Sequence, residues 1–152
     1  MTSKEFSENF GESTIKVIIL GILTFGIYFF IWLSERRRGW KDLAGKEVFN
    51  KNLLIAAAIC SGLSSYLSII QIALYGRVHG TDIFSVSYSI LMIVISWKIG
   101  NWFELYCAKE FKVDLKVNKI LLILFNIFYL NYLFNTLPRR AEKQQLLHGY
   151  TN

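Results

Sequence analysis

Four long apolar stretches alternate with shorter polar segments along the chain and together cover more than half of it. They run over Ile15–Leu33, Leu53–Gly76, Ile83–Phe103 and Ile120–Leu137. At a rise of about 1.5 Å per residue in an α-helix, each stretch is about as long as the hydrocarbon layer of a bilayer is thick. The pattern predicts an all-α, polytopic integral membrane protein with about four transmembrane helices in a single membrane domain, residues 1–152.

The segments around the third stretch refine this picture. A short turn over residues 77–82 joins the second and third stretches, so we expect them to form a helical hairpin. Residues 98–112 interleave apolar and charged positions at helical spacing. They predict an amphipathic extension that lies at the membrane surface or projects from it. Residues 111–117 then alternate apolar and polar positions with period two.

Small residues follow one face of each helix in the predicted hairpin. This small-residue face contains Ser61, Gly62, Ser65, Ser68, Ser89 and Ser96. Lipid tails offer no hydrophobic driving force for helix pairing, and small residues promote pairing because they let two backbones approach closely. We interpret the face as a seam between helices. The alternative is a polar lining to a passage.

The fourth stretch carries three asparagines, at positions 126, 131 and 135. A side-chain amide in hydrocarbon costs free energy unless it is hydrogen-bonded. Asn131 and Asn135 share one helix face and Asn126 lies on another. We therefore expect this helix to be packed on more than one side, or Asn135 to lie at the membrane interface. Pro138, followed by two arginines, is expected to end the helix.

Composition agrees with a membrane protein. Hydrophobic residues make up 53% of the 152 residues and charged residues only 18%, whereas soluble domains are about 25% charged. The net charge of +6 in a soluble protein would suggest nucleic acid as a partner. Here the basic residues cluster at the ends of the apolar stretches, where they anchor helices at lipid headgroups. We expect the lipid bilayer, and not nucleic acid, to be the partner of these charges.

One basic cluster follows the aromatic end of the first stretch. Its candidate lipid-headgroup and topology residues are Trp32, Arg36, Arg37, Arg38, Trp40 and Lys41. Cations at headgroup depth are attracted to anionic lipids, and tryptophan favours the interface because its ring is apolar and its N–H is wet. The cluster is thus either a topology determinant alone or a topology determinant that also holds anionic lipid.

The distribution of basic residues presents a topology problem. Eleven of the seventeen Lys and Arg residues lie in the loops after the first and third stretches. The positive-inside rule then places both loops in the cytoplasm and both termini outside, but Arg139 and Arg140 argue against an outside C-terminus. The conflict disappears if the first or the last stretch is re-entrant or interfacial rather than spanning. We keep four spans as the expectation.

Part of the sequence resembles a known family. The string Ile18–Tyr28 (IILGILTFGIY), followed by Trp32 and basic residues, is similar to the signature of a small bacterial membrane-protein family, the domain-of-unknown-function 4234 family. Tyr129–Asn135 (YLNYLFN) is similar to its closing segment. Within the signature, Gly21 and Gly26 permit a bend or a close helix contact. The resemblance implies an integral membrane protein and implies no chemistry.

Groups that would carry chemistry are sparse. None of the eleven acidic residues falls in the middle of an apolar stretch, although coupled carriers usually need a buried carboxylate. The two histidines and two cysteines lie in different segments, so we expect no metal site, no cofactor and no catalytic set. We therefore expect a non-enzymatic interaction, regulatory or immunity-type component that contacts another membrane protein or itself.

Two alternatives remain open at this stage. One is a small channel or carrier, whose candidate lining is Ser61, Ser65, Ser68, Ser89, Ser96, Asn131 and Asn135. The other is a membrane enzyme without a recognisable motif. For each of these functions, the apolar helices and the family resemblance predict a multi-pass protein of the bacterial cytoplasmic (inner) membrane.

Overall fold

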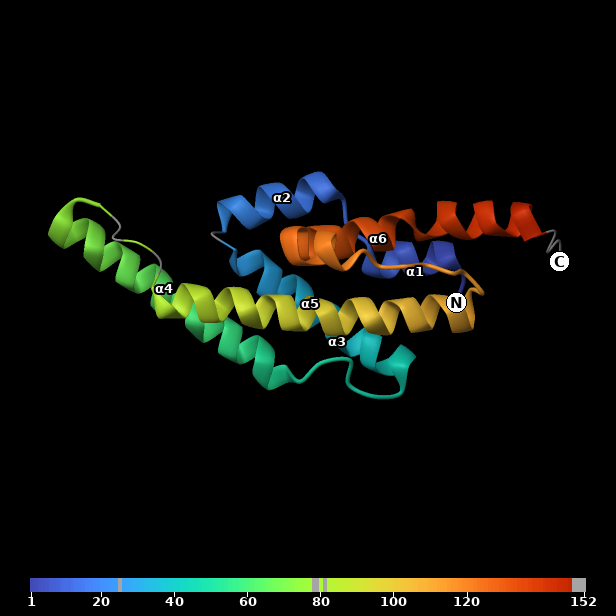
Figure 1. Ribbon diagram of the computed structural model, residues 1–152, viewed down its shortest axis with the longest axis horizontal. Helices are drawn as coiled ribbons and strands as arrows, with labels where there is room; N and C mark the ends of the chain where they lie inside the picture. Colours follow the sequence, from blue (N-terminus) through green and yellow to red (C-terminus); the bar gives the residue numbers. More distant parts are fainter. Residues whose placement is uncertain (25, 78–79, 81, 149–152) are drawn as a thin grey trace.

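The computed structural model describes residues 1–24, 26–77, 80 and 82–148, and the described part is helical without a strand. The prediction of an all-α protein is confirmed. The helices are α1 (Ser3–Phe10), α2 (Thr14–Leu23), α3 (Ile27–Ala44), α4 (Lys51–Tyr75), α5 (Ile83–Glu110) and α6 (Lys119–His148). Figure 1 shows an elongated molecule with both termini toward one end and the α4–α5 turn at the other.

Three of the described helices are long and apolar enough to cross a membrane. They are α4, α5 and the Lys119–Gln144 part of α6. This confirms a polytopic membrane protein, but it corrects the interpretation of the first apolar stretch. Residues 15–33 were expected to form one transmembrane helix, and they are divided between α2 and α3. These two helices fold back on each other as a short hairpin (Figure 1).

The break between α2 and α3 has a local cause. Gly26 precedes α3 with φ +86°, a left-handed conformation that favours glycine. The Thr24 hydroxyl donates to the Leu20 carbonyl at 2.6 Å and accepts the Tyr28 N–H at 2.9 Å, so it satisfies groups on both sides of the break. Gly21 lets the Phe29 ring approach, because a Cβ at position 21 would lie 2.6 Å from Phe29 Cζ. The bend and the close contact expected at the two glycines therefore both occur.

The expected hairpin of the second and third stretches is formed by α4 and α5. Gly76 ends α4 in the left-handed conformation, and Asp82 caps α5 by accepting the Ser85 N–H at 2.8 Å. The Ser64 hydroxyl donates to the same Asp82 carboxylate at 2.7 Å and so ties α4 to the start of α5. The half of this hairpin near the turn extends away from the other helices (Figure 1).

The predicted amphipathic extension over residues 98–112 is the continuation of α5, which runs unbroken to Glu110. Its apolar face is covered by protein, since Ile99, Phe103 and Cys107 are fully buried. The period-two pattern that follows is reproduced in the burial of residues 112–118. Val113, Leu115 and Val117 are buried while the positions between them are exposed.

Helix α6 is bent, and it is longer than expected. Asn126 has φ 46° and ψ −119°, a non-helical conformation at which the helix changes direction. The Ser96 hydroxyl on α5 donates to the Asn126 side-chain oxygen at this bend. The prediction that Pro138 ends the helix is wrong, because α6 continues to His148. Leu137 and Ala141 on either side of the proline are buried, and their packing offsets the backbone hydrogen bond that proline removes.

The core is aromatic and lies at the end of the molecule that holds the termini. Phe6 of α1 is fully buried and lies 5.3 Å from Phe103 and 5.6 Å from Phe134 between ring centroids. Trp32 stacks on Phe134 at 6.2 Å, and Trp40 meets Phe134 edge-on at 5.9 Å. Helices α1, α3, α5 and α6 are thus joined through one cluster of rings.

Candidate functional site

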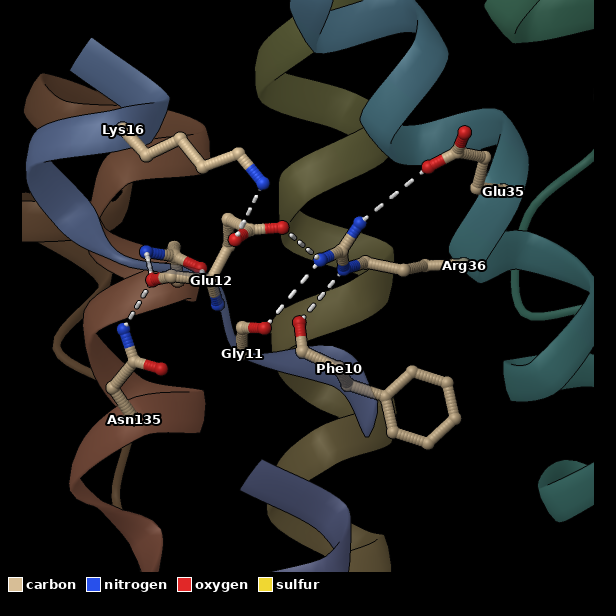
Figure 2. Close-up of polar contacts among 8 residues, drawn as sticks. Phe10, Gly11, Glu12, Lys16, Glu35, Arg36 and Asn135 are labelled. Atoms are coloured by element: carbon tan, nitrogen blue, oxygen red, sulfur yellow. Dashed lines mark hydrogen bonds and ion pairs between the residues drawn. The ribbon is translucent and has the colours of Figure 1, made fainter. Parts of the chain in front are cut away.

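The densest polar cluster of the described residues surrounds the link between α1 and α2. The link turns the chain from a short helix at the aromatic core into the α2–α3 hairpin. Helix α3 contributes Arg36 to this cluster, and α6 contributes Asn131 and Asn135. We call the arrangement of Glu12, Arg36, Asn131 and Asn135 the link clamp (Figure 2).

Arg36 holds the link from the α3 side. Its side chain is only 10% exposed. Its Nε donates to the Phe10 carbonyl at 2.8 Å, and one terminal nitrogen lies 3.3 Å from a carboxylate oxygen of Glu12 (Figure 2). The guanidinium also lies over the Trp32 ring at 4.5 Å, a cation–π contact. The planar fork of arginine suits this combination of a carbonyl, a carboxylate and a ring face.

The amides of α6 hold the link from the opposite side. Asn131 is fully buried, and its amide accepts the Glu12 N–H at 2.9 Å and donates to the Glu12 carbonyl at 2.8 Å. Asn135 donates to the same carbonyl at 2.7 Å. Each of the three asparagine amides in α6 thus has a partner, on more than one side of the helix. Gly11 permits this close approach, because a Cβ there would collide with the Asn135 side chain and the Ser7 carbonyl.

The Glu12 carboxylate is the electrostatic centre of the link clamp. Its partial burial by itself raises its pKa. The hydrogen bond and charge of Lys16, 3.1 Å away, together with the charge of Arg36, outweigh burial, so the pKa of Glu12 lies below its ordinary value. For Arg36, burial is the largest influence and lowers the pKa despite Glu12. Glu12 therefore stays ionised and paired at neutral pH.

The structure divides the predicted headgroup residues into two sets. Trp32 and Trp40 are fully buried in the aromatic core, and their indole N–H groups have no hydrogen-bond partner among the described residues. Arg36 belongs to the link clamp and is bonded to Phe10 and Glu12. Arg37 pairs with Glu47 in the α3–α4 loop. The outward set contains Arg38 and Lys41, which are exposed. A headgroup role therefore remains a prediction for Arg38 and Lys41, while the other four residues contact protein.

The predicted small-residue face is only partly covered. Ser61 and Ser68 are half-buried, whereas Gly62, Ser65 and Ser89 are exposed. The hydroxyls of Ser65 and Ser89 donate within their own helices, to the Ser61 and Ser85 carbonyls. Ser96 is fully buried and bonded to Asn126. The residues considered as a channel lining therefore do not line one surface. Asn131 and Asn135 contact the α1–α2 link, whereas Ser96 contacts Asn126 at the bend of α6.

The geometry indicates what the link clamp can do chemically. Its carboxylate, guanidinium and amides are occupied by one another and by the backbone of the link. It can hold the α1–α2 connection and the α2–α3 hairpin against α6. Over the described ranges, His, Cys, Asp and Glu side chains nowhere gather in groups of three or more that could hold a metal ion.

Sequence reasoning missed the role of α1 and of Glu12. A signal for α1 was present, because Thr2 and Glu5 form a capping box and Phe6 and Phe10 follow at helical spacing. The pairing of Glu12 with Arg36 joins residues 24 positions apart. The spacing of the charges along the chain does not indicate that pairing.

Comparison with known proteins agrees with the resemblance noted in the sequence. The family model for a domain of unknown function, DUF4234, matches residues 12–104, which is more than half of the chain. The chain belongs to this family. The match begins at Glu12 of the link clamp and extends through the break at Gly26 to Glu104 of α5. No curated protein and no solved structure matches the chain.

Proposed function

We propose that this DUF4234 protein is a non-enzymatic component of the bacterial cytoplasmic membrane and acts by binding another membrane protein. The observation that carries the proposal is the outer hairpin, defined as residues 58–75 of α4 and 83–91 of α5. Large apolar side chains of the outer hairpin, such as Ile69 and Leu74, are about two-thirds exposed. The other described residues therefore leave these helix faces free to contact a partner.

The α4 side of the outer hairpin suits a helix as its partner. Ala58, Gly62 and Ser65 are exposed on this side, and a Cβ at Gly62 would meet nothing within 4 Å. A groove between α3 and α4 reaches the same surface. It is lined by Phe30, Ile31, Ser34, Glu35, Leu54, Ile55 and Ala58. A transmembrane helix placed here gains close backbone contact at Gly62 and apolar contact along the groove.

Charge indicates which end of the partner lies at the groove. Glu35 is at the polar end of the groove, and 69% of its side chain is exposed. The neighbouring Arg36 lies 3.9 Å from a Glu35 carboxylate oxygen, but its hydrogen bonds go to Phe10, Gly11 and Glu12. We infer a partner helix that carries a basic residue just beyond its apolar span. Such a residue would reach Glu35 while the span lies along α4.

The link clamp supports a structural rather than a catalytic interpretation of the polar residues. Its charged and amide groups are paired with one another and with the backbone of the link, and they hold the fold. The surface that remains for binding a partner is the outer hairpin. A regulatory or immunity-type activity follows from such a surface. In that activity the outer hairpin binds a transmembrane helix of a target, such as a pore-forming protein, and so prevents the target from assembling.

Photocrosslinking in native membranes tests this proposal. A photoreactive amino acid is placed at Ser65, which is exposed, and at Ala57, which is fully buried, as the matched negative position. We expect one crosslinked product of defined mass from position 65. Gly62→Leu should abolish it by filling the open space, whereas Val86→Leu on α5 enlarges another exposed side chain and should not.

The outcomes separate the choices of partner. A product that contains a different membrane protein supports the proposal. A product of twice the mass of this chain replaces the partner by a second copy. Lipid adducts alone at position 65, unchanged by Gly62→Leu, would refute a binding function for the α4 surface.

A further inference from the structure

The two helical hairpins of this protein differ in the depth that they can reach in a bilayer. Helix α4 has 25 residues, about 37 Å, which exceeds the roughly 30 Å of a hydrocarbon layer. Helix α2 has ten residues, about 15 Å, which is half of that layer. The chain turns back at Gly26, so the α2–α3 hairpin ends where α4 and α5 continue (Figure 1).

The α2–α3 hairpin and the first turns of α6 expose apolar side chains as fully as α4 and α5 do. Ile22 and Leu23 near the tip of the α2–α3 hairpin are about 70% exposed, and Ile27 at the start of α3 is 61% exposed. The first turns of α6 are similarly open, with Leu124 67% exposed. Phe29 of α3 meets Phe128 of α6 edge-on at 5.2 Å, so α3 and α6 meet near the bend of α6.

The charges show which end of the molecule is basic. Between Asn52 and Trp97, which includes the outer hairpin, the only Lys or Arg is Arg77. The other sixteen basic residues lie within or beside α1, α2, α3 and α6 and in or next to the inner halves of α4 and α5. Helices α1, α2, α3 and α6 lie away from the α4–α5 turn (Figure 1), so these charges belong to that side of the molecule. The positive-inside rule is then satisfied by one basic side, and the conflict between Arg36–Arg38 and Arg139–Arg140 disappears.

We propose that the protein inserts as a wedge. The α4–α5 hairpin crosses the bilayer, while the α2–α3 hairpin enters only the leaflet on the basic side. The Lys119–Gln144 part of α6 is long enough to cross, but it bends at Asn126, so in the wedge only its first turns enter that same leaflet. That leaflet must accommodate parts of five helices, α2 to α6, and the other leaflet only two, α4 and α5. The difference in occupied area is relieved when the basic-side leaflet is convex, as it is for amphipathic helices that insert on one side. The protein therefore prefers curved membranes of that sense, whether or not a protein partner binds α4.

Depth is tested first, by cysteine accessibility in a Cys60→Ser, Cys107→Ser background. Single cysteines are placed at Ser3, which is half-buried, and at Lys46 and Arg77, which are exposed. We expect Ser3→Cys and Lys46→Cys to react with an impermeant thiol reagent from the same side, and Arg77→Cys from the other. Reaction of Ser3→Cys and Lys46→Cys from opposite sides would mean that residues 14–44 cross the bilayer, and would overturn the wedge.

Curvature preference is tested in membrane tubes drawn from giant vesicles of phosphatidylcholine and phosphatidylglycerol. The protein carries a fluorophore on Lys46→Cys, and external quencher identifies molecules whose basic side faces out. We expect the tube-to-vesicle density ratio of these molecules to exceed one, and that of the opposite orientation to fall below one. A ratio of one for both orientations would overturn the proposal.

Two variants connect the curvature preference to the α2–α3 hairpin. Thr24→Leu/Gly26→Leu removes the hydroxyl and the left-handed glycine at the break, so it favours one continuous helix. It should move Ser3→Cys to the other side and bring the density ratio to one. Gly62→Ala is the matched control, because its added methyl meets open space, and it should keep the ratio. A density ratio unaffected by the double substitution, with Ser3→Cys relocated, would refute the role of the hairpin.

Discussion

The two ends of this molecule are stabilised by different partners. At the basic end, Phe6, Trp32, Trp40 and Phe134 are nearly or fully buried against one another, and the link clamp satisfies polar groups between helices. At the opposite end, α4 and α5 have mainly each other. Only 11% of the most apolar window of α4 is buried, against 39% for α6. Similar apolar composition thus specifies a packed protein core in one region and a surface for lipid or a partner helix in the other.

Hydropathy indicates that a segment leaves water, but it does not indicate whether protein or lipid takes the place of the water. In the core, the neighbour is a ring of the same chain, and packing is specific. In the outer hairpin, a lipid tail is as apolar as leucine, so truncating a side chain loses little. Substitutions of the same kind should therefore have very different consequences at the two ends.

The largest difference is expected for aromatic and aliphatic truncation. Phe6→Ala removes a fully buried ring and should lower the free energy of unfolding by about 3–5 kcal/mol. Leu74→Ala removes an exposed side chain of the outer hairpin and should leave unfolding within about 0.5 kcal/mol of the parent. Unfolding in mild detergent, followed by circular dichroism, measures both. Equal losses would mean that the outer hairpin is packed against something in the isolated protein.

The next effect concerns the buried amide of the link clamp. Asn131→Leu leaves the Glu12 N–H without its partner, and each buried polar group left unpaired costs about 1–3 kcal/mol. Asn135→Leu should cost less, because Asn135 is exposed and Asn131 still binds the Glu12 carbonyl. The same detergent unfolding assay ranks the two. A larger loss from Asn135→Leu would contradict the geometry of the clamp.

Two glycines offer a matched pair across the regions. Gly11→Ala should destabilise the protein, because the new methyl meets the Asn135 side chain and the Ser7 backbone. Gly62→Ala should stabilise it by about 0.4–1 kcal/mol, because the helix already has a suitable conformation and space is open. The midpoint of thermal unfolding should thus shift in opposite directions. Shifts of the same sign would show that position 62 is not free.

The smallest effect is the pH dependence contributed by Glu12. Its folded pKa lies below the ordinary value of 4.5, so the paired carboxylate stabilises the protein fully above that value. This contribution is lost as the pH falls through the folded pKa. Glu12→Gln should therefore reduce stability at pH 7 and remove part of the acid sensitivity below pH 4.5. Glu8→Gln removes a carboxylate at an exposed position outside the link clamp and is the control; an equal change from it would contradict the assignment to Glu12.

Several elements could be predicted because their causes are local. The α4–α5 hairpin follows from two apolar runs around a short polar turn, and the alternating burial of residues 112–118 follows from their period-two pattern. The two glycines of the first apolar stretch, Gly21 and Gly26, indicated a bend or a close helix contact, and both are present. In each case neighbouring residues determine the backbone, so the pattern along the chain contains the information.

The remaining features depend on residues that are distant in sequence. The chain by itself determined that the protein is helical and belongs in a membrane, because hydropathy and periodicity are properties of short segments. Only the tertiary structure decided that α2 and α3 fold back, that Arg36 turns inward to Glu12, and that α6 continues past Pro138. Those outcomes rest on packing against α1, α5 and α6. The break at Gly26 allows α2 and α3 either to fold back or to diverge, and Pro138 allows α6 either to end or to continue. Contacts with residues elsewhere in the chain decide between these conformations.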